Sequence, residues 1–493
     1  MSDELMELPE GWTWTDVKSI SSVITGKTPS TSNTDFWDGE IPFVTPSQIA
    51  PSGSILPPNR TLTELGATQA RIIPEDSTLA VCIGTVGKIG LLDRPSVINQ
   101  QLNALAPSQS ISARFLYYWS QYFLRSWIIE NASATVNAAI LNKSRLEAAP
   151  VILPPLNEQK RIVAAIESLR DRSQNARSAL SAIPELCDKF RQSVLAAAFR
   201  GDLTADWREQ NPDVEPASVL LERISTELGQ NFNDVQSEID RADGLIPTSW
   251  TWARLKVIVK KIQPGNNFLC PEVPVTDNTV GLVKISAVTW GKFNPKETKT
   301  VADPSKVDPN LFIQPGDLLV TRANTLELVG ASVVVDEIHY KIMLSDKVWR
   351  VDVLEIDKNY INFYLRSKDG RTEIESRATG NQLSMRNISQ NAFKEIVIAI
   401  PPLEEQKEIV QQIASCFNNA DHIKQQYLET KDYLNHLDRS ILAKAFRGEL
   451  VEQDPNDESA SVLLERIRAE REQQAQGKAK KPGKKGQRTI KAE

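Results

Sequence analysis

Two stretches of the chain carry apolar residues in alternating steps of three and four over about four to five heptads. This period of 3.5 residues is typical of helices that pack along a partner helix in a coiled coil. A Pro-Pro pair precedes each stretch, and Gly201 or Gly448 follows a basic residue at its end, as at helix starts and glycine caps. We therefore predict coiled-coil helices over 156–203 and 403–450, with a kink at Pro184 in the first.

The heptad pattern also predicts which side chains form the seam between the two helices. They are the residues that repeat at the apolar positions of each stretch. The predicted seam residues are Ile162, Ile166, Leu169, Leu180, Ile183, Phe190, Val194, Ile409, Ile413, Ile423, Tyr427, Leu434, Leu437 and Ile441.

The chain is a tandem repeat, because four motifs recur in the same order. The pairs are Leu8-Pro-Glu-Gly-Trp-Thr-Trp and Ile246-Pro-Thr-Ser-Trp-Thr-Trp, Pro154-Pro-Leu-Asn-Glu-Gln-Lys and Pro401-Pro-Leu-Glu-Glu-Gln-Lys, Ala198-Phe-Arg-Gly-Asp-Leu and Ala445-Phe-Arg-Gly-Glu-Leu, and Ala217-Ser-Val-Leu-Leu-Glu-Arg-Ile and the identical segment from Ala460. Their offsets are 238, 247, 247 and 243 residues. The helix therefore keeps its length between the repeats, whereas the regions before and after it differ. Two such helices can pair antiparallel, with one globular head at each end.

Each helix is preceded by a stretch of about one domain in length, 1–155 or 246–402. Both stretches mix short β-type runs bounded by turn residues with one predicted helix, at 113–130 and 359–377. We expect two globular heads of the α/β (α+β) class. The connection 204–245 is a linker with a short helix.

The C-terminal part of the chain is predicted to hold a short helix over 451–477 and a basic disordered tail over 478–493. The tail has a charge of +6, against −6 for the whole chain. A non-specific phosphate-binding arm and a solubilising terminus both fit this composition.

Polar and basic residues follow equivalent β-type runs in both heads. Arginine and lysine suit guanine, and asparagine and glutamine suit adenine, so these residues are candidates for DNA contacts. The candidates are Thr45, Ser47, Gln48, Thr85, Asn137, Asn142 and Lys143 in the first head, and Lys284, Ser286, Thr321, Arg322, Asn324, Gln382, Ser384 and Arg386 in the second. The first head has a net charge of −4 and the second of +3, so partners would supply much of the phosphate contact.

Motifs of catalysis are missing from the sequence. Gly26-Lys27-Thr28 is not a phosphate loop, because Ser21 stands where that motif needs glycine. There is no H-E-x-x-H, no G-x-S-x-G and no [DNS]-P-P-[YFW] motif, and the three histidines are too scattered for a metal site. Four scattered cysteines fit a reducing cytoplasm, and no apolar run is long enough to span a membrane. The sequence favours recognition without catalysis.

The order of these motifs closely resembles the specificity subunits of type I restriction-modification systems. The resemblance runs from Leu8 to about Ile467, and its most characteristic part is Ser440-Ile-Leu-Ala-Lys-Ala-Phe-Arg-Gly-Glu-Leu. It implies that 1–155 and 246–402 are target-recognition domains, each of which reads one half of a split, asymmetric DNA site. From 162 to 194 the helix would rise roughly 50 Å, more than the ~34–36 Å of one DNA turn, so the helices would set the spacer.

The resemblance also implies partners and cofactors. The helices would dock two modification subunits, which bring S-adenosylmethionine and methylate adenine N6 in double-stranded DNA. Added motor subunits would bring ATP and Mg²⁺ and cleave unmodified DNA. The chain itself would bind no cofactor and no metal.

Two other functions compete with this hypothesis. A coiled-coil scaffold with two protein-binding heads would show no preference for any DNA sequence. A complete methyltransferase would transfer methyl groups alone, but the chain lacks the motifs and the glycine-rich cofactor loop of that class.

Overall fold

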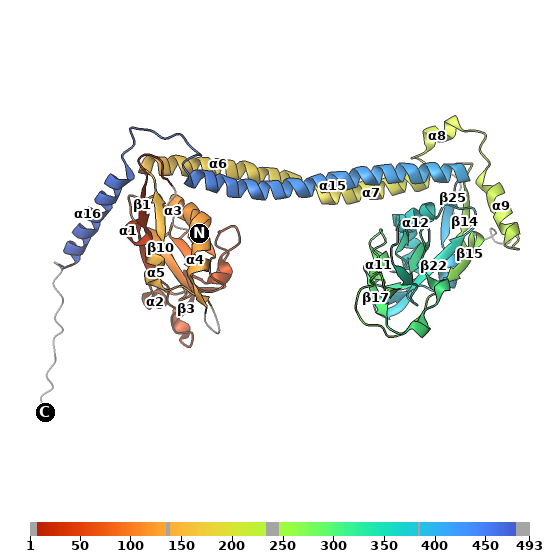
Figure 1. Cartoon of the computed structure of the whole chain (residues 1–493), viewed down its shortest axis with the longest axis horizontal. Helices are drawn as coiled ribbons and strands as arrows, with labels where there is room; N and C mark the ends of the chain where they lie inside the picture. The colour runs from red at the N-terminus through yellow and green to blue at the C-terminus, as the bar shows by residue number, and fades with distance from the viewer. Residues whose placement is uncertain (1–6, 135–138, 233–245, 383–384, 480–493) are drawn as a thin grey trace, which may run out of the picture. The chain divides into compact units, whose positions relative to one another are not determined.

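The computed structural model divides into two compact units (Figure 1). The residues that it describes are 7–134, 139–232, 246–382 and 385–479. Unit 1 comprises Met1–Leu180 and Glu429–Glu493, and unit 2 comprises Ser181–Leu428. Helix α15 (Leu403–Phe446) therefore contributes its last part to unit 1 and its first part to unit 2.

The first head, in unit 1, is built from small sheets. Their strand orders are β1 (Thr13–Asp16) with β13 (Pro150–Leu153); β2 (Ser21–Thr25), β10 (Leu102–Pro107), β6 (Thr78–Val81) and β8 (Ile89–Leu91); β11 (Ser133–Ala134), β12 (Ala139–Ile140) and β7 (Ile83–Gly84); and β4 (Arg60–Leu62), β3 (Trp37–Val44), β9 (Ser96–Ile98) and β5 (Ile72–Ile73). Its helices and those of the rest of the unit are α1 (Val17–Ile20), η1 (Thr34–Phe36), η2 (Pro46–Gln48), α2 (Glu64–Thr68), α3 (Ala113–Trp119), the π-helix η3 (Ser120–Leu124), α4 (Arg125–Asn131), α5 (Lys143–Glu147), α6 (Leu156–Leu180) and α16 (Ala460–Ala479).

The second head, in unit 2, is built in the same way. Its sheets are β14 (Thr251–Arg254) with β25 (Val397–Ile400); β15 (Val259–Gln263), β22 (Val348–Val353), β18 (Leu318–Thr321) and β20 (Ser332–Val334); β23 (Thr379–Gln382), β24 (Met385–Asn387) and β19 (Ala323–Asn324); and β17 (Thr298–Val301), β16 (Val280–Val283) and β21 (Lys341–Met343). Its helices and those of the rest of the unit are α7 (Ile183–Arg200), α8 (Ala205–Gln210), α9 (Ala217–Glu227), η4 (Leu255–Val257), α11 (Ser286–Thr289), η5 (Pro304–Lys306), η6 (Pro309–Leu311), α12 (Lys358–Arg366), α13 (Lys368–Arg377) and α14 (Gln390–Lys394).

The two heads share one topology, which confirms the repeat predicted from the motifs. The order β2-β10-β6-β8 in the first head corresponds to β15-β22-β18-β20 in the second, and β11-β12-β7 corresponds to β23-β24-β19. The outer sheet differs, with four described strands in the first head and three in the second. The helix expected over 359–377 is divided at Ser367, whose hydroxyl caps α13.

The hydrophobic core of each head includes helices from both repeats. Leu463 and Ile467 of α16 pack into the core of the first head, together with Phe446. The equivalent residues of α9, Leu220 and Ile224, pack into the core of the second head. The two identical Ala-Ser-Val-Leu-Leu-Glu-Arg-Ile segments thus pack against equivalent surfaces. The segment of the first repeat packs into the head of the second repeat, and the segment of the second repeat packs into the head of the first.

In unit 1, helix α6 pairs antiparallel with the last part of α15 (Figure 1). Ile162 and Ile166 lie in one buried cluster with Ile441 near the head, and further along α6 the Arg177 guanidinium bonds Asp438 at 2.8 Å. Residue numbers therefore rise along α6 as they fall along α15. This pairing buries the apolar stripe that the heptads predicted.

In unit 2, helix α7 pairs antiparallel with the first part of α15. The Arg191 guanidinium bonds Asp421 at 2.6 Å, and Val194 and Leu195 share a core cluster with Ile409. The kink expected at Pro184 takes the form of a break, since α6 ends at Leu180 and α7 begins at Ile183 with the proline in its first turn.

The predicted seam is wrong at two positions. Phe190 is 46% exposed and Ile423 is 48% exposed. Arg191 takes the inward place beside Phe190, because its guanidinium bonds Asp188 and Asp421 and lies 5.8 Å from the ring centre of Phe417. The other predicted seam residues are buried or half-buried: Ile162, Ile166, Leu169, Leu180, Ile183, Val194, Ile409, Ile413, Tyr427, Leu434, Leu437 and Ile441.

Among the helices that the structure describes, none combines the length and the apolar character needed to cross a membrane.

Candidate nucleic-acid interface

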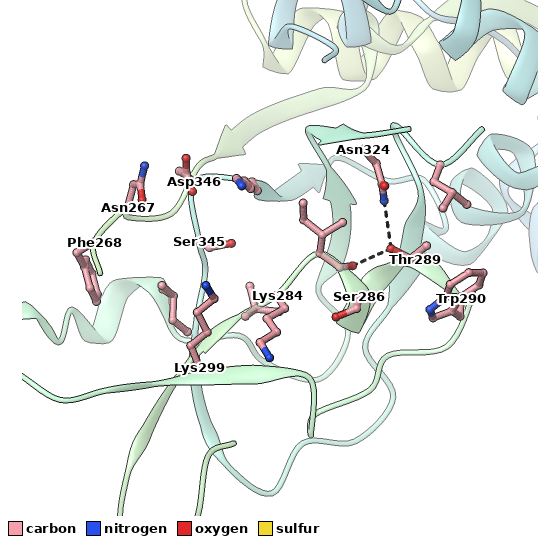
Figure 2. Close-up of a pocket in the computed structure, with 15 residues that line it drawn as sticks. Asn267, Phe268, Lys284, Ser286, Thr289, Trp290, Lys299, Asn324, Ser345 and Asp346 are labelled. Carbon is pink, nitrogen blue, oxygen red and sulfur yellow. Dashed lines mark hydrogen bonds between the residues drawn. The ribbon is translucent and has the colours of Figure 1, made fainter. Parts of the chain in front are cut away.

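The second head has an open cavity of about 490 Å³ beside the end of strand β16 (Figure 2). Three of the residues predicted from the sequence line it, namely Lys284, Ser286 and Asn324. Lys284 directly follows β16, Ser286 begins α11, and Asn324 ends β19. The fold therefore brings together polar side chains that are up to 40 residues apart in the chain.

Hydrogen bonds hold these polar groups in place. The Asn324 amide donates to the Thr289 hydroxyl at 3.4 Å, which in turn donates to the Ile285 carbonyl at 2.9 Å (Figure 2). The Ser286 hydroxyl donates to Glu297 at 2.6 Å. The cavity wall is thus a positioned set of donors and acceptors, which is what the reading of base edges requires.

A smaller cavity of about 230 Å³ adjoins the first, since Asn324, Asp346 and Lys347 line both. Arg322, an exposed residue, also lines it, together with Met385 and Asn387. Arg386 lies on β24 directly opposite Asn324 in the antiparallel ladder. Four cations and one acid are among the described residues that line the two cavities: Lys284, Lys299, Arg322, Lys347 and Asp346.

Trp290 stands at the edge of the larger cavity and is 76% exposed (Figure 2). The next residue, Gly291, has a φ of +78°, a conformation that glycine adopts without strain. The Arg366 guanidinium supports this turn by donating to the Gly291 carbonyl at 3.4 Å, and burial lowers the pKa of Arg366. Trp290 is not among the residues predicted from the sequence, although a Trp-Gly pair after a β-type run is a visible signal of an exposed turn.

Three other predicted contacts of the second head are not among the described residues that line the two cavities, namely Thr321, Gln382 and Ser384. Thr321 is fully buried in β18 and its hydroxyl donates to the Leu328 carbonyl at 3.2 Å, so it faces the core and cannot contact DNA in this conformation. Ser384 and the side chain of Gln382 lie outside the described residues.

In the first head, four of the seven predicted residues lie in two neighbouring turns. Thr45 and Ser47 are at the start of η2, and Thr85 is exposed in the turn after β7. The Lys88 ammonium donates to the Pro46 carbonyl at 3.2 Å and so joins the two turns. Gln48 is buried and its amide oxygen accepts from Thr45, so this predicted reader has a structural role instead.

Two further candidates of the first head, Asn142 and Lys143, are at the start of helix α5. The Asn142 side chain accepts from the Arg145 backbone amide at 2.8 Å, which makes it the cap of this helix. Lys143 pairs with Glu147 at 3.5 Å on the helix surface. Asn137 lies outside the described residues.

The small three-stranded sheet allows the two heads to be compared residue by residue. The Cys82 carbonyl accepts from Leu141, and the Arg322 carbonyl accepts from Ile388, at 2.8 and 3.0 Å. Cys82 and Arg322 therefore occupy the same backbone position, and Gly84 corresponds to Asn324. At these equivalent positions the second head has an exposed arginine and an asparagine, whereas the first has a buried cysteine and a glycine.

A scan against protein-family models matches the type I restriction modification DNA specificity domain at residues 9–181 and 299–430. These two matches fall in both repeats and together span more than half of the chain. The chain therefore belongs to the family of type I restriction-modification specificity subunits.

Individual relatives match over nearly the whole length. The chain is 26% identical over 492 residues to the EcoKI specificity subunit of Escherichia coli strain K12, covering 94% of this chain and 96% of that protein. It is 25% identical over 493 residues to the StySPI specificity subunit of Salmonella potsdam, with the same coverage. The crystal structure of the HsdS subunit from Thermoanaerobacter tengcongensis shares the fold, with a TM-score of 0.56 and 18% identity over 91% of this chain and all of that one.

Proposed function

We propose that the chain specifies the DNA target of a type I restriction-modification complex, with each head reading one half of a bipartite, asymmetric site. The observation that carries this proposal is the pair of equivalent positions in the two heads. The second head presents Arg322 and Asn324 where the first has Cys82 and Gly84. Arginine suits guanine and asparagine suits adenine, so one scaffold with different side chains would read different half-sites.

The test is to sequence the methylated motif of cells that carry the chain with its modification partner. Arg322→Ala or Asn324→Ala should relax one or two positions in one half of the motif, by about 1–3 kcal/mol of discrimination each. Thr85→Ala in the first head is the matched variant and should affect only the other half. Methylation scattered without a split motif in the parent protein would refute the proposal.

We further propose that the chain performs no chemistry itself. The sequence motifs of catalysis are missing, and S-adenosylmethionine would be bound by the modification subunits, which methylate adenine N6. ATP and Mg²⁺ would be bound by restriction subunits, where these accompany the complex. Purified chain that transfers methyl groups on its own would contradict this assignment.

For docking of the modification subunits, we propose the exposed apolar side chains of the helix pair. Leu186, Phe190 and Ile423 are 59%, 46% and 48% exposed on α7 and α15. Apolar side chains at neighbouring exposed positions are typical of protein contacts. The competing function, a scaffold with two protein-binding heads, predicts equal affinity for all DNA sequences at every salt concentration.

The helices would also set the spacer between the half-sites. Deletion of one heptad from one helix shortens it by ~10 Å and should change the spacer or abolish activity. An unchanged motif would refute this role.

A further inference from the structure

Two lysines of the second head converge on one exposed carboxylate. The Lys284 ammonium lies 3.0 Å from Oε2 of Glu272, and the Lys299 ammonium lies 2.6 Å from Oε1. Both lysines line the cavity of about 490 Å³ at the candidate interface. The same two ammonium groups lower the pKa of Glu272, the contribution of Lys299 being the larger.

The two cations are held by the sheet, whereas the anion is on a loop. Lys299 is in β17, paired antiparallel with β16, and the Lys284 backbone amide just after β16 donates to the Glu297 carbonyl at 3.1 Å. Glu272 is in the loop between β15 and β16, and its side chain is 65% exposed. The sheet thus fixes the backbones of the two lysines, and Thr300 of β17 also donates to the carbonyls of Pro271 and Val273 on either side of Glu272. The Glu272 side chain itself is exposed, so its rotation would leave both ammonium groups open to another anion.

We propose that Lys284 and Lys299 form a binding site for one phosphate of the DNA backbone, which the Glu272 carboxylate occupies while DNA is absent. This inference rests on the proposed function. A carboxylate offers two oxygens to two ammonium groups, as do the two non-bridging oxygens of a phosphodiester. The site also borders the cavity with Ser286 and Asn324, so that a phosphate here would fix the strand beside the groups that contact its bases.

An ordinary surface ion pair would have none of these consequences. Exposed pairs contribute little to stability, and removing one carboxylate would then change DNA binding only through the net charge of the protein. A phosphate site, by contrast, predicts that Glu272 competes with DNA for the same two lysines. The two explanations therefore differ in how the variants depend on one another.

The experiment measures DNA binding by the full chain in complex with its modification subunits, using fluorescence anisotropy at several salt concentrations. The probes are two unmethylated duplexes, one that contains the motif recognised by the complex and one that lacks it. Glu272→Gln should tighten binding to both duplexes by about threefold to tenfold at low salt. Lys284→Met and Lys299→Met should weaken binding to both, and the double variant should reduce the slope of log K against log salt by about 0.9, the value for one phosphate.

The matched control is Glu355→Gln, which removes the same charge from an exposed glutamate of the same head that is paired with Arg223. It lines neither cavity. In a protein that also carries Lys284→Met and Lys299→Met, Glu272→Gln should have no more effect than Glu355→Gln. Thermal unfolding of each variant shows whether the fold is retained.

Equal binding by Glu272→Gln and Glu355→Gln in the parent background, with an unchanged salt slope in the lysine variants, would overturn the phosphate site. So would a loss of affinity confined to the duplex with the motif, since that result indicates base contacts. Failure of the proposed function is a separate result, in which the parent complex binds both duplexes equally well.

Discussion

The indole nitrogen of Trp12 donates a hydrogen bond of 3.0 Å to Oε2 of Glu158, in the interior of unit 1. Glu158 is 1% exposed, and its other oxygen has no hydrogen-bond partner among the described residues. The equivalent carboxylate of unit 2, Glu405, accepts from the Trp250 indole at 2.8 Å, from the Thr204 hydroxyl at 2.7 Å and from the Arg208 guanidinium at 2.5 Å.

The difference arises after the two long helices, where the repeats diverge. Val451 stands at the position equivalent to Thr204, so that a hydroxyl donor is lost in the second repeat. The Arg161 guanidinium, near Glu158, bonds Asp457 at 2.8 Å instead. One buried carboxylate is therefore fully paired and the other only half paired.

Neutralising the two carboxylates should accordingly have different effects on stability. Glu405→Gln leaves Arg208 with a weaker acceptor and should lower the free energy of unfolding by about 2–3 kcal/mol. Glu158→Gln removes a partly unpaired buried charge while keeping an acceptor for Trp12, and should leave stability unchanged or raise it by about 1 kcal/mol. Differential scanning calorimetry of the two variants measures this, and equal losses would contradict the expectation.

The same carboxylate predicts a pH dependence. Burial raises the pKa of Glu158 above its ordinary value of 4.5, so the folded protein holds this proton more tightly than the unfolded chain does. The linkage relation then gives a contribution to stability that falls as pH rises through the raised pKa. The advantage of Glu158→Gln over the parent should be present at neutral pH and shrink as the pH falls towards 4.5. An advantage that is independent of pH would show that the charge is not its cause.

The helices and the repeat could be predicted from the sequence because their pattern is local. A heptad period and identical motifs are visible in the residues themselves, and the structure confirms the antiparallel pairing. The predicted heptad register is wrong at Phe190, because contacts with the partner helix decide which side chains of α7 face inward. The Arg191 guanidinium donates to Asp421 of the partner helix, which is 230 residues away in the sequence. No local pattern shows such a contact.

The candidate interface was predictable only in part, for a related reason. Residue type predicted DNA contacts for four side chains that line the two cavities, namely Lys284, Ser286, Arg322 and Asn324. Thr321, the residue before Arg322, belongs to the same polar run but faces the core. Whether a strand residue faces solvent depends on the sheet that covers it, so residue type alone could not separate the two.

The corrected register can be tested with two aspartate variants of α7. Phe190→Asp changes an exposed position and should alter the free energy of unfolding by no more than about 0.5 kcal/mol. It should weaken capture of the modification subunit by about tenfold, or about 1.4 kcal/mol, because it puts a charge on the proposed docking surface. Val194→Asp buries an unpaired charge and should destabilise the protein by about 3 kcal/mol or more. Equal destabilisation by both variants would favour the seam predicted from the heptads.

Trp290 offers a test of base contact that is independent of charge. An exposed indole beside a polar cavity can stack on a base or enter between two base pairs, and loss of such a contact costs about 1–3 kcal/mol. Trp290→Ala should therefore weaken binding to the recognised motif by about fivefold or more, with no change in the salt slope, since no charge is altered. Trp290→Phe keeps an aromatic face and should recover most of the affinity. Val462→Ala, at an exposed position of α16, is the control and should bind as the parent does. A Trp290→Ala protein that binds and methylates like the parent would remove this residue from the interface, whereas a parallel loss of thermal stability would point to a structural role in the Gly291 turn.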